Sequence, residues 1–302
     1  MWYKSLTSGL LALLIILSIC FSYALATSDE RRVIVRTEDE LIAAIDNKIE
    51  YIYIDGYIPL SETIVLNHAA NVTLRGQGTI TVSGNYRHFA RWRGYQLVID
   101  GDIILTRAAN YDGLGGGVRV AVGTLVLHQG HIYNNHMRRG GGIELESGRV
   151  YIMDGGTVSH NHAEIGGGVY VGDTWGLFTG SLTMLTVSGG QIVENVANFS
   201  GGGVHNATGI LQLESGVIAN NHASGHGGVY VSDFTRYDIG HAMRIYENYP
   251  INRFESTGFP WQEFLHTLSV FHILVLLAII VIGMLLTKIR NSQKRQRDTS
   301  YT

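Results

Sequence analysis

Apolar and polar residues alternate with a period of two along short stretches in the middle of the chain. Leu125–Leu127, Leu185–Val187 and Leu211–Leu213 each place two apolar side chains on one side of an extended segment. This period predicts β-strands, because helices repeat apolar residues every three to four positions. Weaker stretches of the same kind begin at Tyr51 and continue through Val72–Leu74. The pattern therefore predicts an all-β fold built from many short strands.

Three further columns of residues recur along the chain, and the first of them, a glycine triplet, has spacings of 25, 26, 35 and 25 residues. A Gly-Gly-Gly triplet followed by Val or Ile begins four times, and a fifth copy has His in the first place: Gly115, Gly140, Gly166, Gly201 and His226. A Gly-x-Ile/Val column follows at Gly130, Gly156, Gly190 and Gly216. An asparagine column comes next at Asn135, Asn161, Asn195, Asn221 and Asn248. Columns that advance together indicate a repeat.

A repeat of this length with two or three short strands and no helix predicts one coil of a parallel β-helix. Residues 51–248 fit about seven coils, stacked at the usual strand spacing of roughly 4.8 Å. The five asparagines are expected to form a structural ladder of hydrogen-bonded amides, each Asn at a corner in the left-handed region. The glycine triplets are expected where φ is positive or where backbones approach closely.

Residues 27–50 are predicted to cap the first coil. Thr37 and Glu40 have the spacing of a capping box, and Leu41–Ile45 has the apolar pattern of a short amphipathic helix. A helix there would cover the open edge of the first coil, which otherwise invites aggregation. Residues 249–267 are expected to form a C-terminal cap or a juxtamembrane linker.

The two ends of the chain predict export and membrane anchoring. Residues 1–26 combine Lys4, the apolar run Leu10–Phe21 and the small residues Ala24 and Ala26, which predicts a secretory signal peptide; an uncleaved signal anchor is the alternative. Residues 268–287 predict a membrane-spanning helix, and the basic tail 288–302 is then cytoplasmic by the positive-inside rule. The protein is expected at the cell membrane, single-pass, with its N-terminal domain extracytoplasmic.

The net charge differs between these segments. Residues 27–267 contain 16 Lys and Arg against 24 Asp and Glu, a net charge of −8, whereas the whole chain carries −3. An acidic domain is a poor candidate for nucleic-acid binding, which needs cations to contact phosphates. The single cysteine, Cys20, falls in the signal peptide, so the mature chain would offer no thiol chemistry. The sequence implies no cofactor.

Residues from about Val33 to Asn248 resemble the right-handed parallel β-helix proteins of the pectin-lyase-like group. The motif GGGVYV at Gly166–Val171 and the GGxIxxN units are similar to the repeats of bacterial surface proteins, including polymorphic outer-membrane proteins. The resemblance implies the fold but no single activity, since this scaffold hosts lyases, hydrolases, adhesins and structural spacers.

An enzyme on this fold needs convergent carboxylates or a basic residue beside clustered Asp. Gly225-His226-Gly227 and Arg244-Ile245 resemble two motifs of polygalacturonase-like hydrolases, but the Asn-Thr-Asp and Asp-Asp motifs of that family do not occur in this sequence. The sequence therefore contains no motif that would supply the paired carboxylates of a glycoside hydrolase. Asp100 and Asp102 form a close acidic pair, which an exposed turn explains.

The 35-residue repeat carries an insertion, and insertions in solenoids project as loops, often on the binding face. Asp173, Trp175 and Phe178 are its candidate ligand-binding residues, because aromatic rings stack on sugars or anchor partners. The alternative is that these rings fold back onto the coil. Arg91 and Trp92, in a stretch of mixed aromatic and Arg residues, are candidates for binding anionic glycans; an ordinary early coil is the alternative.

His136 and His162 each follow a ladder asparagine, and adjacent coils would bring them together. Two imidazoles about 5 Å apart can share a metal ion, which makes this pair a weak metal candidate. Solvent-facing stacked rings are the favoured interpretation, and the sequence predicts no metal site.

Together these features predict a non-enzymatic binding or adhesion module on the cell surface. Its expected partners are the membrane and a ligand such as a glycan or another cell-surface molecule, without nucleic acid. The alternatives are a carbohydrate-active hydrolase or lyase on the same fold, and a purely structural stalk.

Overall fold

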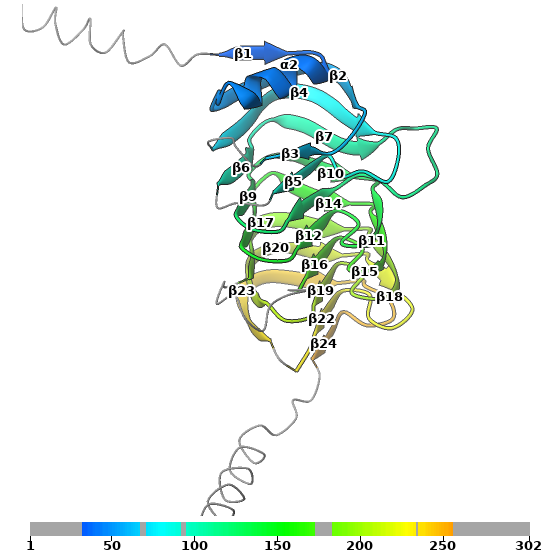
Figure 1. Ribbon diagram of the computed structural model, residues 1–302. Helices are drawn as coiled ribbons and strands as arrows, with labels where there is room; N and C mark the ends of the chain where they lie inside the picture. The colour runs from blue at the N-terminus through cyan, green and yellow to red at the C-terminus, as the bar shows by residue number, and fades with distance from the viewer. Residues whose placement is uncertain (1–31, 67–70, 92–94, 173–182, 234, 256–302) are drawn as a thin grey trace, which may run out of the picture. The chain divides into compact units, whose positions relative to one another are not determined.

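The computed structural model describes residues 32–66, 71–91, 95–172, 183–233 and 235–255. Their strands run in parallel and form a β-solenoid of about seven turns (Figure 1). The predicted signal peptide (1–26) and membrane helix (268–287) lie outside these ranges. Within them, none of the helices is long and apolar enough to cross a membrane.

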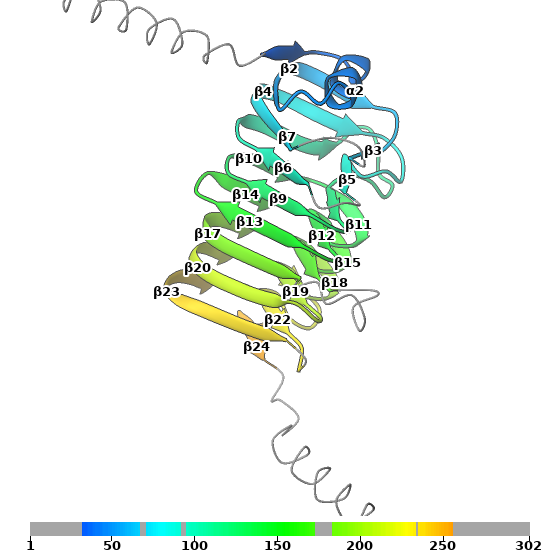
Figure 2. The same cartoon turned by 60° about the vertical axis from the view of Figure 1, so that its left-hand side comes forward.

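In the described part of the chain, the largest sheet has twelve strands, which stack along the solenoid (Figure 2). Three middle turns contribute a pair of short strands, and other turns contribute one long strand. The members are β1 (Val33–Val35), β2 (Tyr51–Leu60), β4 (Val72–Val82), β6 (Gln96–Ile99), β7 (Asp102–Arg107), β9 (Thr124–Leu127), β10 (Gly130–Tyr133), β13 (Arg149–Met153), β14 (Gly156–Ser159), β17 (Met184–Val193), β20 (Ile210–Ala219) and β23 (Arg236–Tyr246).

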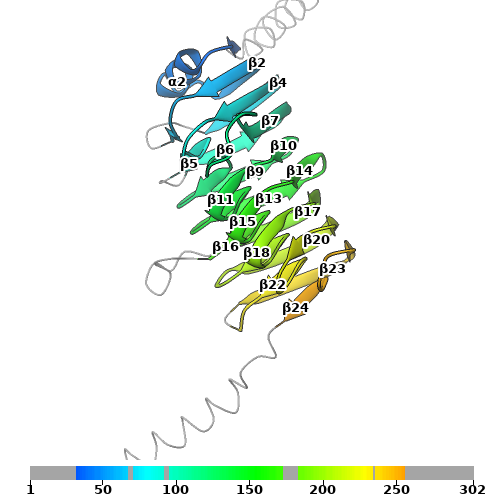
Figure 3. The ribbon, with the colours of Figure 1, turned by 90° about the vertical axis from the view of Figure 1, so that its right-hand side faces the viewer.

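Two smaller sheets complete the turns that are described. The eight-stranded sheet contains β3 (Ile64–Val65), β5 (Phe89–Arg91), β8 (Val118–Val120), β12 (Ile143–Leu145), β16 (Val169–Val171), β19 (Val204–Asn206), β22 (Val229–Val231) and β24 (Arg253–Glu255). The four-stranded sheet contains β11 (His136–Arg139), β15 (His162–Ile165), β18 (Val196–Ser200) and β21 (His222–Ala223), and begins only at the middle of the solenoid (Figure 3).

Inward-facing apolar residues form continuous columns through the solenoid. Leu125, Val150, Leu185 and Leu211 occupy matching positions on four neighbouring strands, and each is fully buried. Burying a side chain of this size contributes about 2 kcal/mol. The predicted alternation therefore corresponds to the core.

The predicted N-terminal helix is confirmed as α2 (Glu38–Asp46). Thr37 is its N-cap and accepts a hydrogen bond from the Glu40 N–H at 3.2 Å. The Glu40 carboxylate accepts from the Arg36 N–H at 2.6 Å, one residue earlier than a capping box would place it. Leu41 and Ile45 of this helix are buried in the core. The helix covers the N-terminal end of the solenoid (Figure 1).

The asparagine column forms a hydrogen-bonded ladder inside the solenoid. The Nδ2 groups of Asn135, Asn161 and Asn195 each donate to the Oδ1 atom of the next ladder asparagine at 3.0 Å, and Asn221 donates to Asn248 at 2.9 Å. The expectation that these asparagines themselves occupy the left-handed region was wrong. The residue before each one has positive φ instead: Asn134, His160, Glu194, Asn220 and Glu247. The corner bends one residue earlier, so the ladder Asn can point inward.

The three glycines of a triplet meet three different constraints. In the copy that begins at Gly201, this first glycine has φ of +65°, and a Cβ there would lie 2.5 Å from the Cβ of His205. A Cβ at Gly202 would meet the carbonyl oxygen of Gly227 on the next turn at 2.5 Å. A Cβ at Gly203 would lie 3.0 Å from the ladder amide of Asn221. Positive φ and close backbone approach, both expected from the sequence, therefore act at different positions of one triplet.

Candidate functional site

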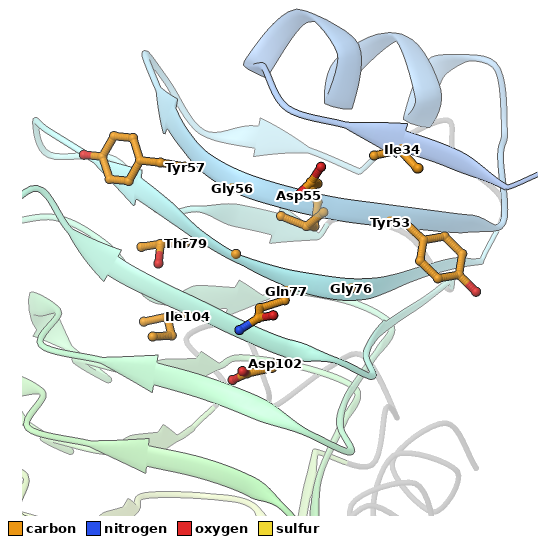
Figure 4. A pocket seen from close by; sticks show the side chains of 12 residues that line it. Ile34, Tyr53, Asp55, Gly56, Tyr57, Gly76, Gln77, Thr79, Asp102 and Ile104 are labelled. Carbon is orange, nitrogen blue, oxygen red and sulfur yellow. The ribbon is translucent and has the colours of Figure 1, made fainter.

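A groove of about 710 Å³ lies on the outer face of the twelve-stranded sheet, near its N-terminal end. It crosses β1, β2, β4 and β7, so residues from four successive strands line it (Figure 4). A groove of this volume is in the range of ligand sites in proteins.

Glycines keep the floor of the groove clear. Gly56 and Gly76 have φ of +95° and +94°, a conformation that side chains of L-residues rarely adopt. A Cβ added at Gly56 would have no atom within 4 Å, so this position faces open space. Gly78 also lines the floor. The hollow therefore exists because strands β2 and β4 carry no side chains where they bend.

Two tyrosines stand at opposite ends of the groove (Figure 4). Tyr53 is half-buried, whereas 58% of Tyr57 is exposed. The Tyr57 hydroxyl accepts a hydrogen bond from Thr81 Oγ1 at 2.9 Å, which orients its ring. Exposed aromatic rings on a rigid strand provide flat apolar surfaces at low entropic cost.

Polar side chains follow one another between the tyrosines. Asp55, Gln77 and Asp102 occupy matching positions on β2, β4 and β7, and all three are exposed. Carboxylate and amide groups in such a row can hydrogen-bond several hydroxyl groups of an extended ligand. The lining therefore combines aromatic surface with hydrogen-bonding groups.

The carboxylates of the groove are not arranged for hydrolysis. Asp55 and Asp102 lie two strands apart, roughly 10 Å by strand spacing, which is twice the separation of about 5 Å in retaining glycosidases and at the upper end of the inverting range, about 9.5 Å. One Asp55 oxygen, Oδ2, is already bound by Arg36, at 2.8 Å to Nε and 2.6 Å to Nη2. The Asp55 side chain is 54% exposed, unlike the buried carboxyl of a general acid. Binding is a better match than acid–base chemistry.

Beside the groove, an ion-pair chain connects three turns. Arg75 Nε lies 3.3 Å from Asp100 Oδ2, and His128 Nδ1 lies 2.7 Å from Asp100 Oδ1. Asp100 is thus not simply part of an exposed turn, as the sequence suggested, because both of its oxygens bind cationic or imidazole groups. Among the described residues, these ion pairs come closest to the basic residue and aspartate that a lyase would need.

Of the binding residues predicted from the sequence, only Arg91 belongs to the part of the chain that the structure describes. Asp173, Trp175, Phe178 and Trp92 lie outside the described residues. Arg91 ends strand β5 in the eight-stranded sheet, whereas the groove lies on the twelve-stranded one.

The predicted histidine neighbours do meet across turns. The rings of His136 and His162 lie 4.3 Å apart between centroids and are tilted by 31°. His162 Nε2 contacts Asn198 Oδ1 at 2.9 Å. Burial, followed by the charge of His162, lowers the pKa of His136. Among the residues placed by the structure, no three His, Cys, Asp or Glu side chains group in a way that could hold a metal ion.

The groove was missed although the sequence contains a signal for it. In Tyr51–Leu60 the buried Ile52, Ile54 and Ile58 alternate with Tyr53 and Tyr57. The alternation places both tyrosines on the outer face of one strand. What the sequence alone did not reveal is the glycine bend that makes the surface between them concave.

Comparison with known proteins gives no further guide. No family model matches the chain, and no curated protein or solved structure matches it either.

Proposed function

We propose that this protein is a membrane-anchored, surface-displayed binding module that holds a glycan in the groove without converting it. The single observation that carries the proposal is the pair Tyr53 and Tyr57, which flank a glycine-floored hollow containing Asp55, Gln77 and Asp102. Tyrosine rings, amides and carboxylates together suit the apolar faces and hydroxyl groups of sugars.

The charges at the groove favour a neutral glycan. Its lining includes Asp55 and Asp102 and contains no Lys or Arg. Arg36 binds Asp55 at the rim, where its charge is offset. An anionic sugar would meet net repulsion from Asp102, so neutral hexose oligomers are the proposed ligands.

The proposal extends the sequence-based expectations of topology and family resemblance. The solenoid belongs to the right-handed, pectin-lyase-like type, exported by the N-terminal segment and held by residues 268–287 with its tail in the cytoplasm. An adhesion role follows from surface display of the groove.

The test is a panel of neutral and acidic oligosaccharides, added to the full-length chain and followed by calorimetry and by product analysis in the same samples. We expect saturable binding of a neutral oligosaccharide and no new reducing ends or unsaturated products. Product formation would instead support the hydrolase or lyase alternative, for which Arg75, Asp100 and His128 are the residues to replace first. Absence of binding across the panel would leave the structural stalk.

A further inference from the structure

A second cavity, of about 500 Å³, lies where the four-stranded sheet begins. Its charged lining comes from three strands and the segment before β5: Arg87, Arg138, Arg139, Glu144 and Glu164. The cavity is separate from the groove, because it lies between the four- and eight-stranded sheets. It is more enclosed by charged groups and therefore suits a smaller, charged ligand.

Three guanidinium groups share two carboxylates at the wall of this cavity. Glu144 binds Arg87 at 2.9 Å through Oε2 and Arg139 at 3.1 Å through Oε1. Glu146 binds Arg119 at 2.8 Å and lies 3.8 Å from Arg139. The network therefore has one more positive than negative charge.

The network contains a desolvated ion pair. The side chains of Arg87 and Glu144 are 6% and 10% exposed. Arg87 also donates to the carbonyl oxygens of Gly140 and Arg139, both at 2.7 Å, but its buried Nε has no hydrogen-bond partner among the described residues. Burial lowers the pKa of Arg87 despite the nearby Glu144. The pair with Glu144 balances the charge of Arg87, so the excess positive charge of the network is shared by Arg119 and Arg139. An anion in the cavity, beside Arg139, would neutralise that excess.

The rest of the cavity lining indicates the chemistry of the uncharged part of the ligand. Leu114, Met137 and Ile165 contribute apolar surface to the same cavity. Arg138 is 75% exposed and its Nε lies 3.4 Å from Glu164 Oε1, so this ion pair adds no net charge. The pair lies at the opening of the cavity. A guanidinium binds a carboxylate with charge-assisted, often bidentate hydrogen bonds.

We propose that this cavity binds a carboxylate monoanion whose remaining part has an apolar face, such as a sugar acid. The carboxylate faces the guanidiniums of Arg138 and Arg139, and the apolar face contacts Met137 and Ile165. The proposal is independent of the groove, since it concerns another face and an anionic rather than a neutral ligand.

The test titrates the full-length chain with D-glucuronate, N-acetylneuraminate and benzoate, with neutral D-glucose as the control ligand. Saturable binding of at least one carboxylate, and none of glucose, is expected. The carboxylate that binds most tightly distinguishes a sugar acid from a simple organic acid. If none of the three carboxylates binds, the proposal is overturned.

Variants of two residues at the opening should change the affinity for a carboxylate in opposite directions. Arg138→Gln should weaken carboxylate binding by roughly tenfold, because one charge-assisted interaction is lost. Glu164→Gln should tighten it, because a competing carboxylate is removed. Arg149→Gln, an exposed arginine on β13, is the matched control and should change nothing. Binding that responds to neither Arg138 nor Glu164 would also overturn the proposal. Replacing Tyr57 should leave this binding intact, which separates it from the groove.

Discussion

Asn161 donates two hydrogen bonds to the same atom of Asn195. Its Nδ2 group and its backbone N–H both lie 3.0 Å from Asn195 Oδ1. Asn161 Nδ2 also donates to the Ile132 carbonyl at 2.9 Å, and both side chains are fully buried. One amide thus satisfies the buried backbone of two turns, which explains why asparagine recurs at this corner.

Replacing a middle member of the ladder should destabilise the solenoid strongly. Asn195→Ala removes the acceptor of Asn161 and the donor to the Val158 carbonyl, so buried polar groups lose their partners. We expect the free energy of unfolding to fall by about 3 kcal/mol or more, measured by urea denaturation. Asn198→Ala, an exposed asparagine on β18, is the control and should cost little. Equal effects of the two variants would contradict a structural ladder.

The first glycine of a triplet should not tolerate alanine. Gly201→Ala combines positive φ with a contact between the new methyl group and His205. We expect a loss of about 2 kcal/mol or more in thermal or urea unfolding. Gly113→Ala is the comparison, because its new methyl group would meet only the hydroxyl end of the Tyr111 side chain, not backbone, and no positive φ is involved. If Gly201→Ala left the stability unchanged, the backbone would not require glycine at the first position of the triplet.

Acid should destabilise the solenoid through its buried histidines. Burial lowers the pKa of both His88 and His205 from 6.5 to about 4. The unfolded chain then binds more protons than the folded one, so stability is complete above pH 6.5 and falls as the pH drops toward 4. Each such shift is worth roughly 3 kcal/mol at the lower end.

The variant His205→Phe isolates one of these contributions. It keeps an aromatic ring between Tyr170 and Tyr230, against which His205 stacks at 5.5 and 4.6 Å. Urea unfolding at several pH values should show a flatter dependence between pH 6.5 and 4. His222→Gln, at an exposed position, should leave the wild-type slope. A slope that does not change in His205→Phe would refute the assignment.

Removing an aromatic ring from the groove should weaken glycan binding. Tyr57→Ala deletes an exposed ring on a rigid strand, and we expect affinity for a bound neutral oligosaccharide to fall roughly three- to tenfold. Tyr237→Ala, on β23 of the same sheet but far along the solenoid, is the matched control. Calorimetric titration measures both. Similar affinities for wild type and Tyr57→Ala would exclude the ring from the site.

The repeated part of the fold was predictable because its constraints recur. Inward Leu211 and Leu213, the triplet at Gly201 and the ladder residue Asn221 each mark a place that recurs in successive later turns, so one physical requirement appears several times. The corner conformation was harder to predict, because the residue with positive φ varies from Asn220 to Glu194.

The surface features were harder to predict from the sequence. Asp55 lies on an early turn without a glycine triplet or ladder asparagine, so no column marks how it aligns with Gln77 and Asp102. The cluster around Glu144 joins residues such as Arg87, 57 positions away. Only the register between turns brings these side chains together, and short outward-facing segments do not encode that register locally.

Hydroxyl-radical footprinting of the full-length chain with a bound neutral oligosaccharide tests the central claim most directly. The method reports the solvent exposure of individual aromatic side chains. The groove predicts that labelling of Tyr53 and Tyr57 falls when the ligand is added, while Tyr237 is labelled as before. Protection confined to Trp175 and Phe178, with Tyr53 and Tyr57 unchanged, would contradict the account and assign binding to the inserted segment.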